Sequence, residues 1–121
     1  MFEVESDKAK NFLAISFSKR VGPEEAERCA KEVERYLPGL RPGFSLLTDL
    51  SDLEEMDVAC APYLSQSMDL FSEHGIGKVI RIIPDPSKDI GLTIMSRFHY
   101  PRDIPIVTYA TLAEAMDNLP D

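Results

Sequence analysis

The chain has 121 residues, of which 44% are hydrophobic and 28% are charged, and this length and composition are typical of one globular domain. The 13 Lys and Arg residues are outnumbered by 21 Asp and Glu residues, so the formal net charge is −8 at pH 7. Nucleic acids and anionic membrane surfaces bind to cationic faces, and we therefore expect neither as a partner.

The cysteines and the N-terminal residues indicate a reducing compartment. Cys29 and Cys60 each lie among apolar neighbours in a predicted helical region, which favours small buried side chains over a disulfide framework or a zinc site. Residues 1–5 lack the basic start and apolar run of a signal peptide, and no stretch is long enough to span a membrane. We expect a cytoplasmic domain over residues 1–121, with no cofactor and no metal.

The first half of the chain alternates strand and helix patterns. Phe2–Glu5 and Phe12–Phe17 are predicted strands, and the second is apolar enough to be covered on both faces. Gly22–Glu25 predicts a helix start, because proline suits the first helical position and acidic residues suit the positive end of the helix dipole. This helix ends at Pro38-Gly39, and Phe44–Asp49 is the next predicted strand.

The second half continues the alternation. A helix is predicted between Val58 and His74, and its regular part begins near Pro62 after a turn at Val58–Ala61, because proline removes a backbone donor. A strand, a helix capped by Ser87, a strand and a last helix follow, at Lys78–Ile83, Ser87–Phe98, Ile104–Tyr109 and Thr111–Leu119.

The last helix begins with a capping box, Thr111-Leu112-Ala113-Glu114. Its apolar residues recur at helical spacing and are expected to face inward: Leu112, Ala115, Met116 and Leu119. The complete order is β-β-α-β-α-β-α-β-α. Single helices between strands favour right-handed crossovers, which predicts an α/β fold with a mixed, mostly parallel five-stranded sheet covered by about four helices.

One segment carries a family resemblance. Leu46-Leu47-Thr48-Asp49-Leu50-Ser51, followed by Met56-Asp57, resembles the core motif of STAS domains, which occur in sulfate transporters and anti-sigma-factor antagonists. The rest is similar to the small stand-alone STAS-like branch related to the lipid-binding CRAL-TRIO fold. That likeness rests on Pro42-Gly43-Phe44, Pro84-Asp85-Pro86, Phe98-His99-Tyr100-Pro101 and the closing Ala110–Leu119 helix.

The chain departs from the family motif at one functional position. Where the motif continues with Ser-Ser-Gly after its aspartate, this chain has Val58-Ala59-Cys60. In the antagonists a serine there is phosphorylated, but Ala59 has no hydroxyl, so that switch does not carry over. Asp57 does carry over, either as a helix cap, which we favour, or as part of a partner-facing loop.

Two further groups of residues are candidates for chemistry. Cys60 is the one candidate nucleophile, but no histidine lies near it in sequence, which favours a buried structural thiol over a thiol enzyme. Five carboxylates are predicted to form an acidic loop after the third strand, and without a patterned glycine turn they favour solvated charge over a cation site: Asp49, Asp52, Glu54, Glu55 and Asp57.

Arg97–Arg102 is a basic and aromatic cluster on an acidic protein. We favour the interpretation that Arg97 and His99 complement the negative end of a helix dipole and that Phe98 belongs to the core. The alternative is an interface that includes Arg97, His99 and Tyr100, because Arg and Tyr are frequent at binding hot spots.

The leading hypothesis is therefore a non-enzymatic regulatory or protein-interaction module that uses the Ser51–Ala61 loop and helix start as its partner surface. The alternative is a carrier of a small apolar or lipid-like ligand, as the CRAL-TRIO relationship implies, and a homodimer stays open. The candidate binding residues are Asp49, Ser51, Asp57, Val58, Ala59, Cys60, Arg97, His99 and Tyr100.

Overall fold

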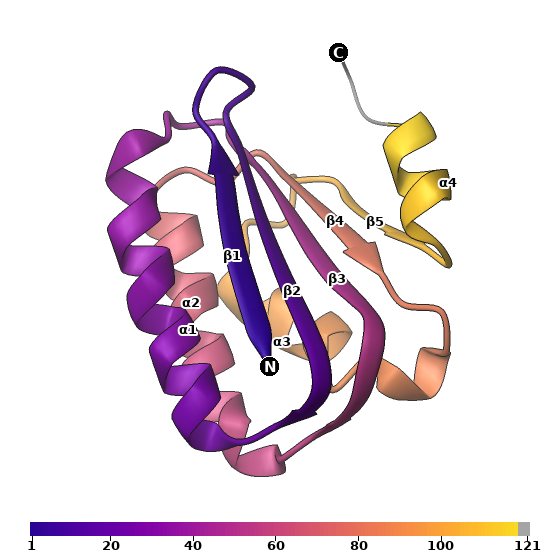
Figure 1. Cartoon of the computed structure of the whole chain (residues 1–121). Coiled ribbons are helices and arrows are strands. Elements are labelled where there is room, and N and C mark those ends of the chain that lie inside the picture. Colours follow the sequence, from indigo (N-terminus) through magenta and orange to yellow (C-terminus); the bar gives the residue numbers. More distant parts are fainter. Residues whose placement is uncertain (119–121) are drawn as a thin grey trace.

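The structure, a computed structural model, describes residues 1–118 (Figure 1). Five strands form one sheet in the order β1-β2-β3-β4-β5, in which β1 is antiparallel to β2 and every other neighbouring pair is parallel. The mixed, mostly parallel five-stranded sheet is therefore confirmed. The strands are β1 (Phe2–Asp7), β2 (Phe12–Val21), β3 (Ser45–Met56), β4 (Lys78–Ile82) and β5 (Ile106–Tyr109).

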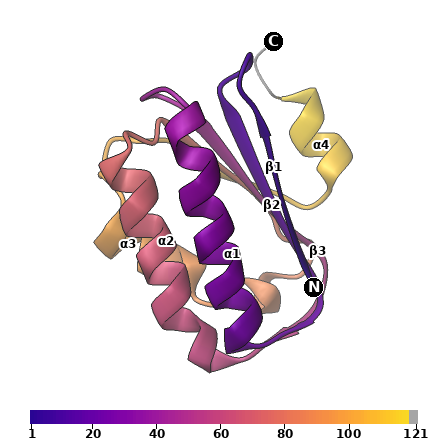
Figure 2. The same ribbon diagram turned by 60° about the vertical axis from the view of Figure 1, so that its left-hand side comes forward.

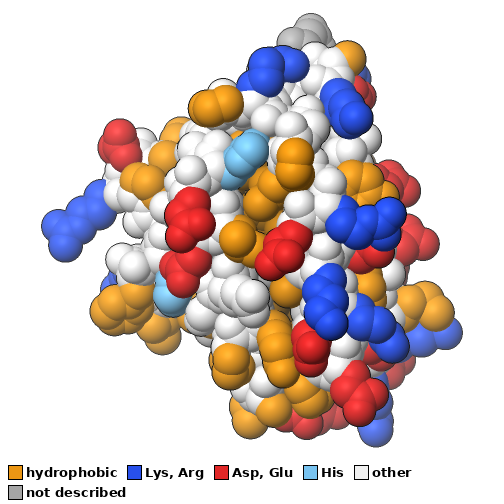
Figure 3. Space-filling view, turned by 90° about the vertical axis from the view of Figure 1, so that its left-hand side faces the viewer, with side chains coloured by type: hydrophobic (Ala, Val, Ile, Leu, Met, Phe, Trp, Pro, Cys, Tyr) orange, Lys and Arg blue, Asp and Glu red, His pale blue; other side chains and the backbone are white. Residues whose placement is uncertain are grey.

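The helices divide unequally between the two faces of the sheet. Helices α1 (Pro23–Tyr36), α2 (Ala61–Glu73) and α3 (Leu92–His99) lie on one face, and α4 (Leu112–Asp117) lies on the other (Figure 2). Each parallel strand is added beside the previous one in the same direction, so crossovers of one hand place all three connecting helices on one face. The space-filling view of the helical face shows acidic and basic side chains interspersed with apolar ones (Figure 3).

Two hydrophobic clusters lie on the two faces of the sheet. The larger one fills the space under α1–α3, and Val79 of β4 belongs to it. Ile80 and Ile82 point the other way and pack with Ala115 of α4 in the smaller cluster. This alternation follows from the period of two residues along a strand, and it places Arg81 on the same side as Val79, under the helices.

The third strand is longer than predicted. The sequence interpretation ended it at Asp49 and began a loop at Ser51, but β3 continues to Met56, which pairs with Val21 of β2. The prediction of a loop from Ser51 is therefore wrong for Ser51–Met56, which belong to β3. Beyond Leu50 this part of β3 buries Leu53 and leaves its carboxylates exposed, so its polarity reflects solvent exposure and not a loop conformation.

The region after β4 also differs from the prediction. Ser87 lies in a short 3-10 helix, η3 (Pro86–Lys88), and its backbone N–H donates to the Asp85 carboxylate at 3.0 Å, so Asp85 is the cap. Helix α3 begins only at Leu92, after Gly91 at a φ of 78°. Phe98, expected in the core, is 80% exposed because α3 turns Leu92 and Ser96 inward.

The last two elements are shorter than predicted. Strand β5 begins at Ile106, two residues later than expected. Thr111 caps α4 by accepting a hydrogen bond from the backbone N–H of Glu114 at 3.1 Å, as the capping box predicts. Ala115 is fully buried, as predicted. Leu112 and Met116 are 44% and 55% exposed, so the prediction that they face inward is wrong. Leu119 lies outside the described residues.

None of the helices within residues 1–118 has the length and hydropathy needed to cross a membrane.

Candidate functional site

The end of β3 and the start of the helical segment after it meet at Asp57. Its backbone N–H donates to the carbonyl oxygen of Val21 at 3.0 Å, which closes the pairing of β3 with β2. Its carboxylate oxygen Oδ1 accepts a hydrogen bond from the backbone N–H of Ala59 at 2.8 Å. Asp57 is thus the N-cap of the 3-10 helix η2 (Val58–Cys60), which leads directly into α2, and the capping role is confirmed.

A hollow of about 450 Å³ adjoins this cap. Arg20 and Glu55 lie on its wall, where the Arg20 guanidinium nitrogen Nε is 3.8 Å from the Glu55 carboxylate, and both side chains are largely exposed. Val58 also lines the hollow and is 89% exposed, the largest exposed fraction among the large hydrophobic residues of the described chain. A largely exposed apolar side chain therefore lies beside charged ones in this hollow.

Cys60 belongs to the interior on the other side of η2. Its side chain is fully buried, and Sγ lies 3.6 Å from the carbonyl oxygen of Val21, to which the thiol donates. Burial, and secondly the nearby Asp57 charge, raise the pKa of the Cys60 thiol above its usual value. A thiol that is inaccessible and resists ionisation is a poor nucleophile, which fits the structural interpretation of this residue.

Asp49 and Ser51 do not join Asp57. Asp49 lies in β3 on the face toward α4, where it lines two other hollows, and its Oδ1 accepts a hydrogen bond from the backbone N–H of Ser51 at 2.9 Å. The last residues of β3, whose register with β2 is irregular, separate Asp49 and Ser51 from the cap at Asp57. The five carboxylates consequently form no common site, and no cluster of His, Cys, Asp and Glu within residues 1–118 could hold a metal.

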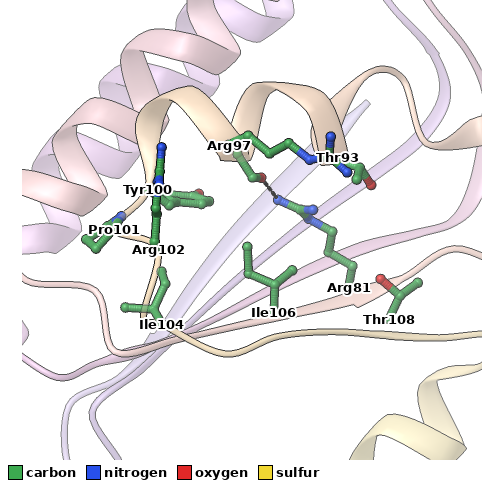
Figure 4. A pocket seen from close by; sticks show the side chains of 10 residues that line it. Arg81, Thr93, Arg97, Tyr100, Pro101, Arg102, Ile104, Ile106 and Thr108 are labelled. Carbon is green, nitrogen blue, oxygen red and sulfur yellow. Dashed lines mark hydrogen bonds between the residues drawn. The ribbon is translucent and has the colours of Figure 1, made fainter.

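The Arg97–Arg102 cluster spans the end of α3 at His99, and its side chains lie in different surroundings. His99 Nδ1 lies 2.6 Å from the Asp69 carboxylate, which connects α3 to α2. Tyr100 is 7% exposed, and burial raises the pKa of its hydroxyl. Arg97 and Tyr100, with Arg102, line a pocket of about 540 Å³ between α3 and β5 (Figure 4).

Sequence reasoning missed the central residue of that pocket. Arg81 lies in the middle of β4, is 2% exposed, and donates from Nη2 to the Ser96 hydroxyl oxygen of α3. A lone charged residue within the apolar run Val79–Ile83 was the signal that could have identified it.

No protein-family model matches the chain, and no curated protein sequence matches it. Solved structures do match. The anti-sigma factor antagonist SpoIIAA in its unphosphorylated form superimposes with a TM-score of 0.64 at 17% identity, over 97% of this chain and 96% of SpoIIAA.

Two other solved structures agree with this match. An uncharacterised protein from Shewanella loihica, described as having a SpoIIAA-like fold, matches with a TM-score of 0.69 at 16% identity, over 99% of this chain and 93% of its own. A putative anti-sigma factor antagonist from Thermotoga maritima matches with a TM-score of 0.62 at 20% identity, over 96% and 92%. The chain therefore has the SpoIIAA-like STAS fold that the Asp49-Leu50-Ser51 motif predicts.

Proposed function

We propose that the chain is a non-enzymatic regulatory module that binds a protein partner through the η2 surface, defined as Asp57, Val58, Ala59 and the adjoining hollow. The observation that carries this proposal is Val58, an apolar side chain 89% exposed beside the capped start of η2. The SpoIIAA-like structures support it, because two of those compared are described as anti-sigma factor antagonists or putative ones.

The η2 surface has the composition of a small binding site. Burying a valine side chain contributes about 1.5–3 kcal/mol, and such a gain is available only to a partner that covers it. The exposed Arg20 and Glu55 supply a polar rim around this apolar point, the arrangement that is usual in protein–protein interfaces. The Asp57 cap holds the backbone of η2 in one conformation, which lowers the entropy that binding costs.

Partner binding at this surface is independent of phosphorylation at residue 59. Phosphate adds up to two negative charges and repels acidic partners, but Ala59 offers no acceptor oxygen for it. The proposed module is therefore always able to bind its partner, because residue 59 lacks the phosphorylatable hydroxyl that the family motif has there. Control of binding then has to come from the amount of partner or from another site on the domain.

A protein partner is preferred over an apolar ligand because of the size of the interior cavity. The cavity among the core residues Phe17, Leu46, Met68 and Phe71 has a volume of about 40 Å³. Pockets that bury drug-sized ligands measure about 300–1,000 Å³, so a lipid-like molecule would have to displace packed core side chains. The carrier hypothesis thus finds no preformed space among these core side chains.

The test compares two exposed apolar residues on different surfaces. Val58→Asp introduces a charge on the η2 surface, and the matched control Ile94→Asp introduces it on α3, where Ile94 is 62% exposed. Each immobilised protein is incubated with lysate of the source cells, before and after phosphatase treatment, and bound proteins are quantified by mass spectrometry.

We expect a partner that is enriched on the unaltered protein and on the Ile94→Asp variant, and at least tenfold depleted on Val58→Asp, with no effect of phosphatase. Equal capture by all three proteins, or loss on both variants, would contradict the η2 surface as the binding site.

A further inference from the structure

The pocket between α3 and β5 concentrates positive charge on an otherwise acidic protein. Its lining includes Arg81, Arg97 and Arg102 and no Asp or Glu, although the chain carries a net charge of −8. Its volume of about 540 Å³ is in the range of small-molecule sites. Figure 4 shows Arg81 rising from the sheet toward α3, and Arg97 extending along that helix toward Thr93.

The pocket exists because α3 does not cover the edge of the sheet. Arg81 is paired in register with Thr108 of β5, and both lie on the helical side. Helix α3 has only eight residues and ends at His99, so the helical side of β5 stays open. Ile106 is 41% exposed there, although it occupies the register position opposite Val79, which is fully buried.

Arg81 is a buried cation without a protein anion. Its Nη2 donates to the Ser96 hydroxyl, which in turn donates to the carbonyl oxygen of Leu92 at 2.7 Å. Within residues 1–118 it forms no ion pair with a carboxylate, and its Nε and Nη1 have no protein acceptor. Every completely enclosed side-chain nitrogen within residues 1–118 has a hydrogen-bond partner, so Nε and Nη1 of Arg81, which have none, are not completely enclosed. Arg81 is one of the residues that line the pocket.

This arrangement is costly for the free protein. Burial lowers the pKa of Arg81, and electrostatic interactions with Tyr100 and Asp89 act in the opposite direction. A guanidinium nevertheless remains protonated in proteins, so the charge persists and needs compensation. Asp89 does not supply it directly, because it forms no ion pair with Arg81; its two carboxylate oxygens instead accept hydrogen bonds from the backbone N–H and the hydroxyl of Thr93.

From these observations we propose that the pocket binds a small organic oxyanion, a carboxylate or a phosphate ester, whose charged group lies against the free edge of the Arg81 guanidinium. Nη2 carries two N–H groups, and the Ser96 hydroxyl accepts from one of them. The other lies parallel to an N–H of Nη1 or of Nε, so one edge of the planar guanidinium still presents two parallel donors that match the oxygens of either group. Arg97 and Arg102, which form no ion pair within residues 1–118, attract the anion at the rim. Ile104 and Ile106 give the ligand an apolar wall for its carbon skeleton.

This site is separate from the η2 surface. The two depressions share no lining residue, so the oxyanion site is tested without reference to a protein partner. A small ligand here offers a means of control to a domain whose residue 59 has no hydroxyl.

The experiment titrates the full chain with three probes, inorganic phosphate, acetate and hexanoate, and follows backbone and arginine Nε–H resonances by NMR. We expect saturable shifts at Arg81 and at residues 93–108 with phosphate, with hexanoate, or with both. Phosphate binding alone identifies a phosphate ligand, whereas hexanoate binding at least fivefold tighter than acetate identifies a carboxylate with an apolar body.

Variants separate this site from general charge effects. The exposed pair Arg97→Gln/Arg102→Gln is expected to weaken binding at least tenfold. The matched pair Arg28→Gln/Arg35→Gln, which removes the same charge from α1, is expected to leave binding unchanged. Arg81→Lys keeps the charge but loses the paired donors, and should weaken binding while the chain stays folded.

Three results overturn the proposal: no saturation by any probe at millimolar concentration, equal binding by the Arg97/Arg102 variant, or equal weakening in the Arg28/Arg35 control.

Discussion

The Asp57 carboxylate accepts a hydrogen bond from the backbone N–H of Ala59 at 2.8 Å. The same aspartate donates its own N–H to Val21 at the end of β2, so one residue both terminates the β2–β3 pairing and begins the helical segment that follows. Asp57, the aspartate of the STAS-like motif, thus has a structural role at the junction of β3 and η2. A functional test at this residue has to separate the effect of its negative charge from the effect of its capping hydrogen bond.

Two substitutions of Asp57 make that separation. Asp57→Ala removes the cap and should lower the free energy of unfolding by about 1 kcal/mol, because an N-H group at the start of the helix loses its partner. Asp57→Asn keeps a capping oxygen and should stay within about 0.5 kcal/mol of the unaltered protein. Urea denaturation measures both. Equal stability of the Ala variant would show that the hydrogen bond contributes nothing.

The Asn variant then reports on recognition. A partner that reads the negative charge of the η2 surface should bind the Asn variant more weakly although its stability is preserved. A partner that reads the shape around Val58 should bind it equally well.

The thiols should react slowly in the folded protein. Cys29 and Cys60 are both buried, and burial raises the pKa of each. Iodoacetamide at pH 7.5 is therefore expected to alkylate the native protein much more slowly than the urea-unfolded protein, in which both thiols are free. Rapid labelling of one thiol in the native state, located by peptide mass spectrometry, would revive the thiol-enzyme hypothesis.

Cys29 also makes stability depend on alkaline pH. Burial, with a smaller contribution from the Glu32 charge, raises its pKa from 9.0 to about 12. Between those values the unfolded chain releases a proton that the folded chain retains, so stability is complete below pH 9 and falls as the pH rises toward 12. The slope from this thiol is at most about 1.4 kcal/mol per pH unit.

Replacing Cys29 with Ala isolates that contribution. The variant loses some core packing at every pH, but its free energy of unfolding should fall less steeply than that of the unaltered protein above pH 9. Urea denaturation at pH 8, 9 and 10 gives the two slopes. Parallel slopes would mean that the thiol does not retain its proton in the folded state.

Much of the fold could be predicted because its signals are local. Apolar runs, Pro23 at a helix start and the Thr111 capping box each constrain the backbone within a few residues, and the element order followed from them. The extension of β3 to Met56 could not be predicted in this way. Its exposed carboxylates are polar because β3 meets solvent there, and residue polarity reports exposure rather than backbone conformation.

The candidate site could be predicted only where a residue contacts others that are close to it in the sequence. Asp57 caps the adjacent η2, which is a local relationship. The pocket around Arg81 depends on where α3, which begins at Leu92, leaves the sheet uncovered, and no local pattern contains that information. The prediction that Phe98 lies in the core is wrong for a related reason: α3 is apolar on several sides, so its sequence does not determine which side faces inward.

A pair of phenylalanines tests the corrected orientation of α3. Phe98 is 80% exposed and Phe71 of α2 is 3% exposed. Phe98→Ala should change the free energy of unfolding by no more than about 0.5 kcal/mol, whereas Phe71→Ala should lower it by about 3–5 kcal/mol through the cavity that it leaves. A cost above 2 kcal/mol for Phe98→Ala, measured by urea denaturation, would mean that this side chain is covered in solution.

The close approach of two turns at one end of the sheet gives the last prediction. The Gly77 N–H donates to the carbonyl oxygen of Phe44 at 2.8 Å, and a Cβ atom on Gly77 would lie 2.7 Å from the carbonyl oxygen of Gly43. That obstacle is backbone held in place by the hydrogen bond from the Gly43 N–H to Gly75, so it cannot rotate away as a side chain would. Gly77→Ala should therefore destabilise the protein by about 1–3 kcal/mol, the usual cost of overpacking.

Gly22 provides the matched control for Gly77. It is the N-cap of α1 without a side-chain hydrogen bond, and nothing lies within 4 Å of an added Cβ. Gly22→Ser supplies the missing capping oxygen and should raise the free energy of unfolding by a few tenths of a kcal/mol. Urea denaturation of both variants decides the matter: if Gly77→Ala is as stable as Gly22→Ser, the two turns are farther apart in solution than the 2.7 Å contact requires.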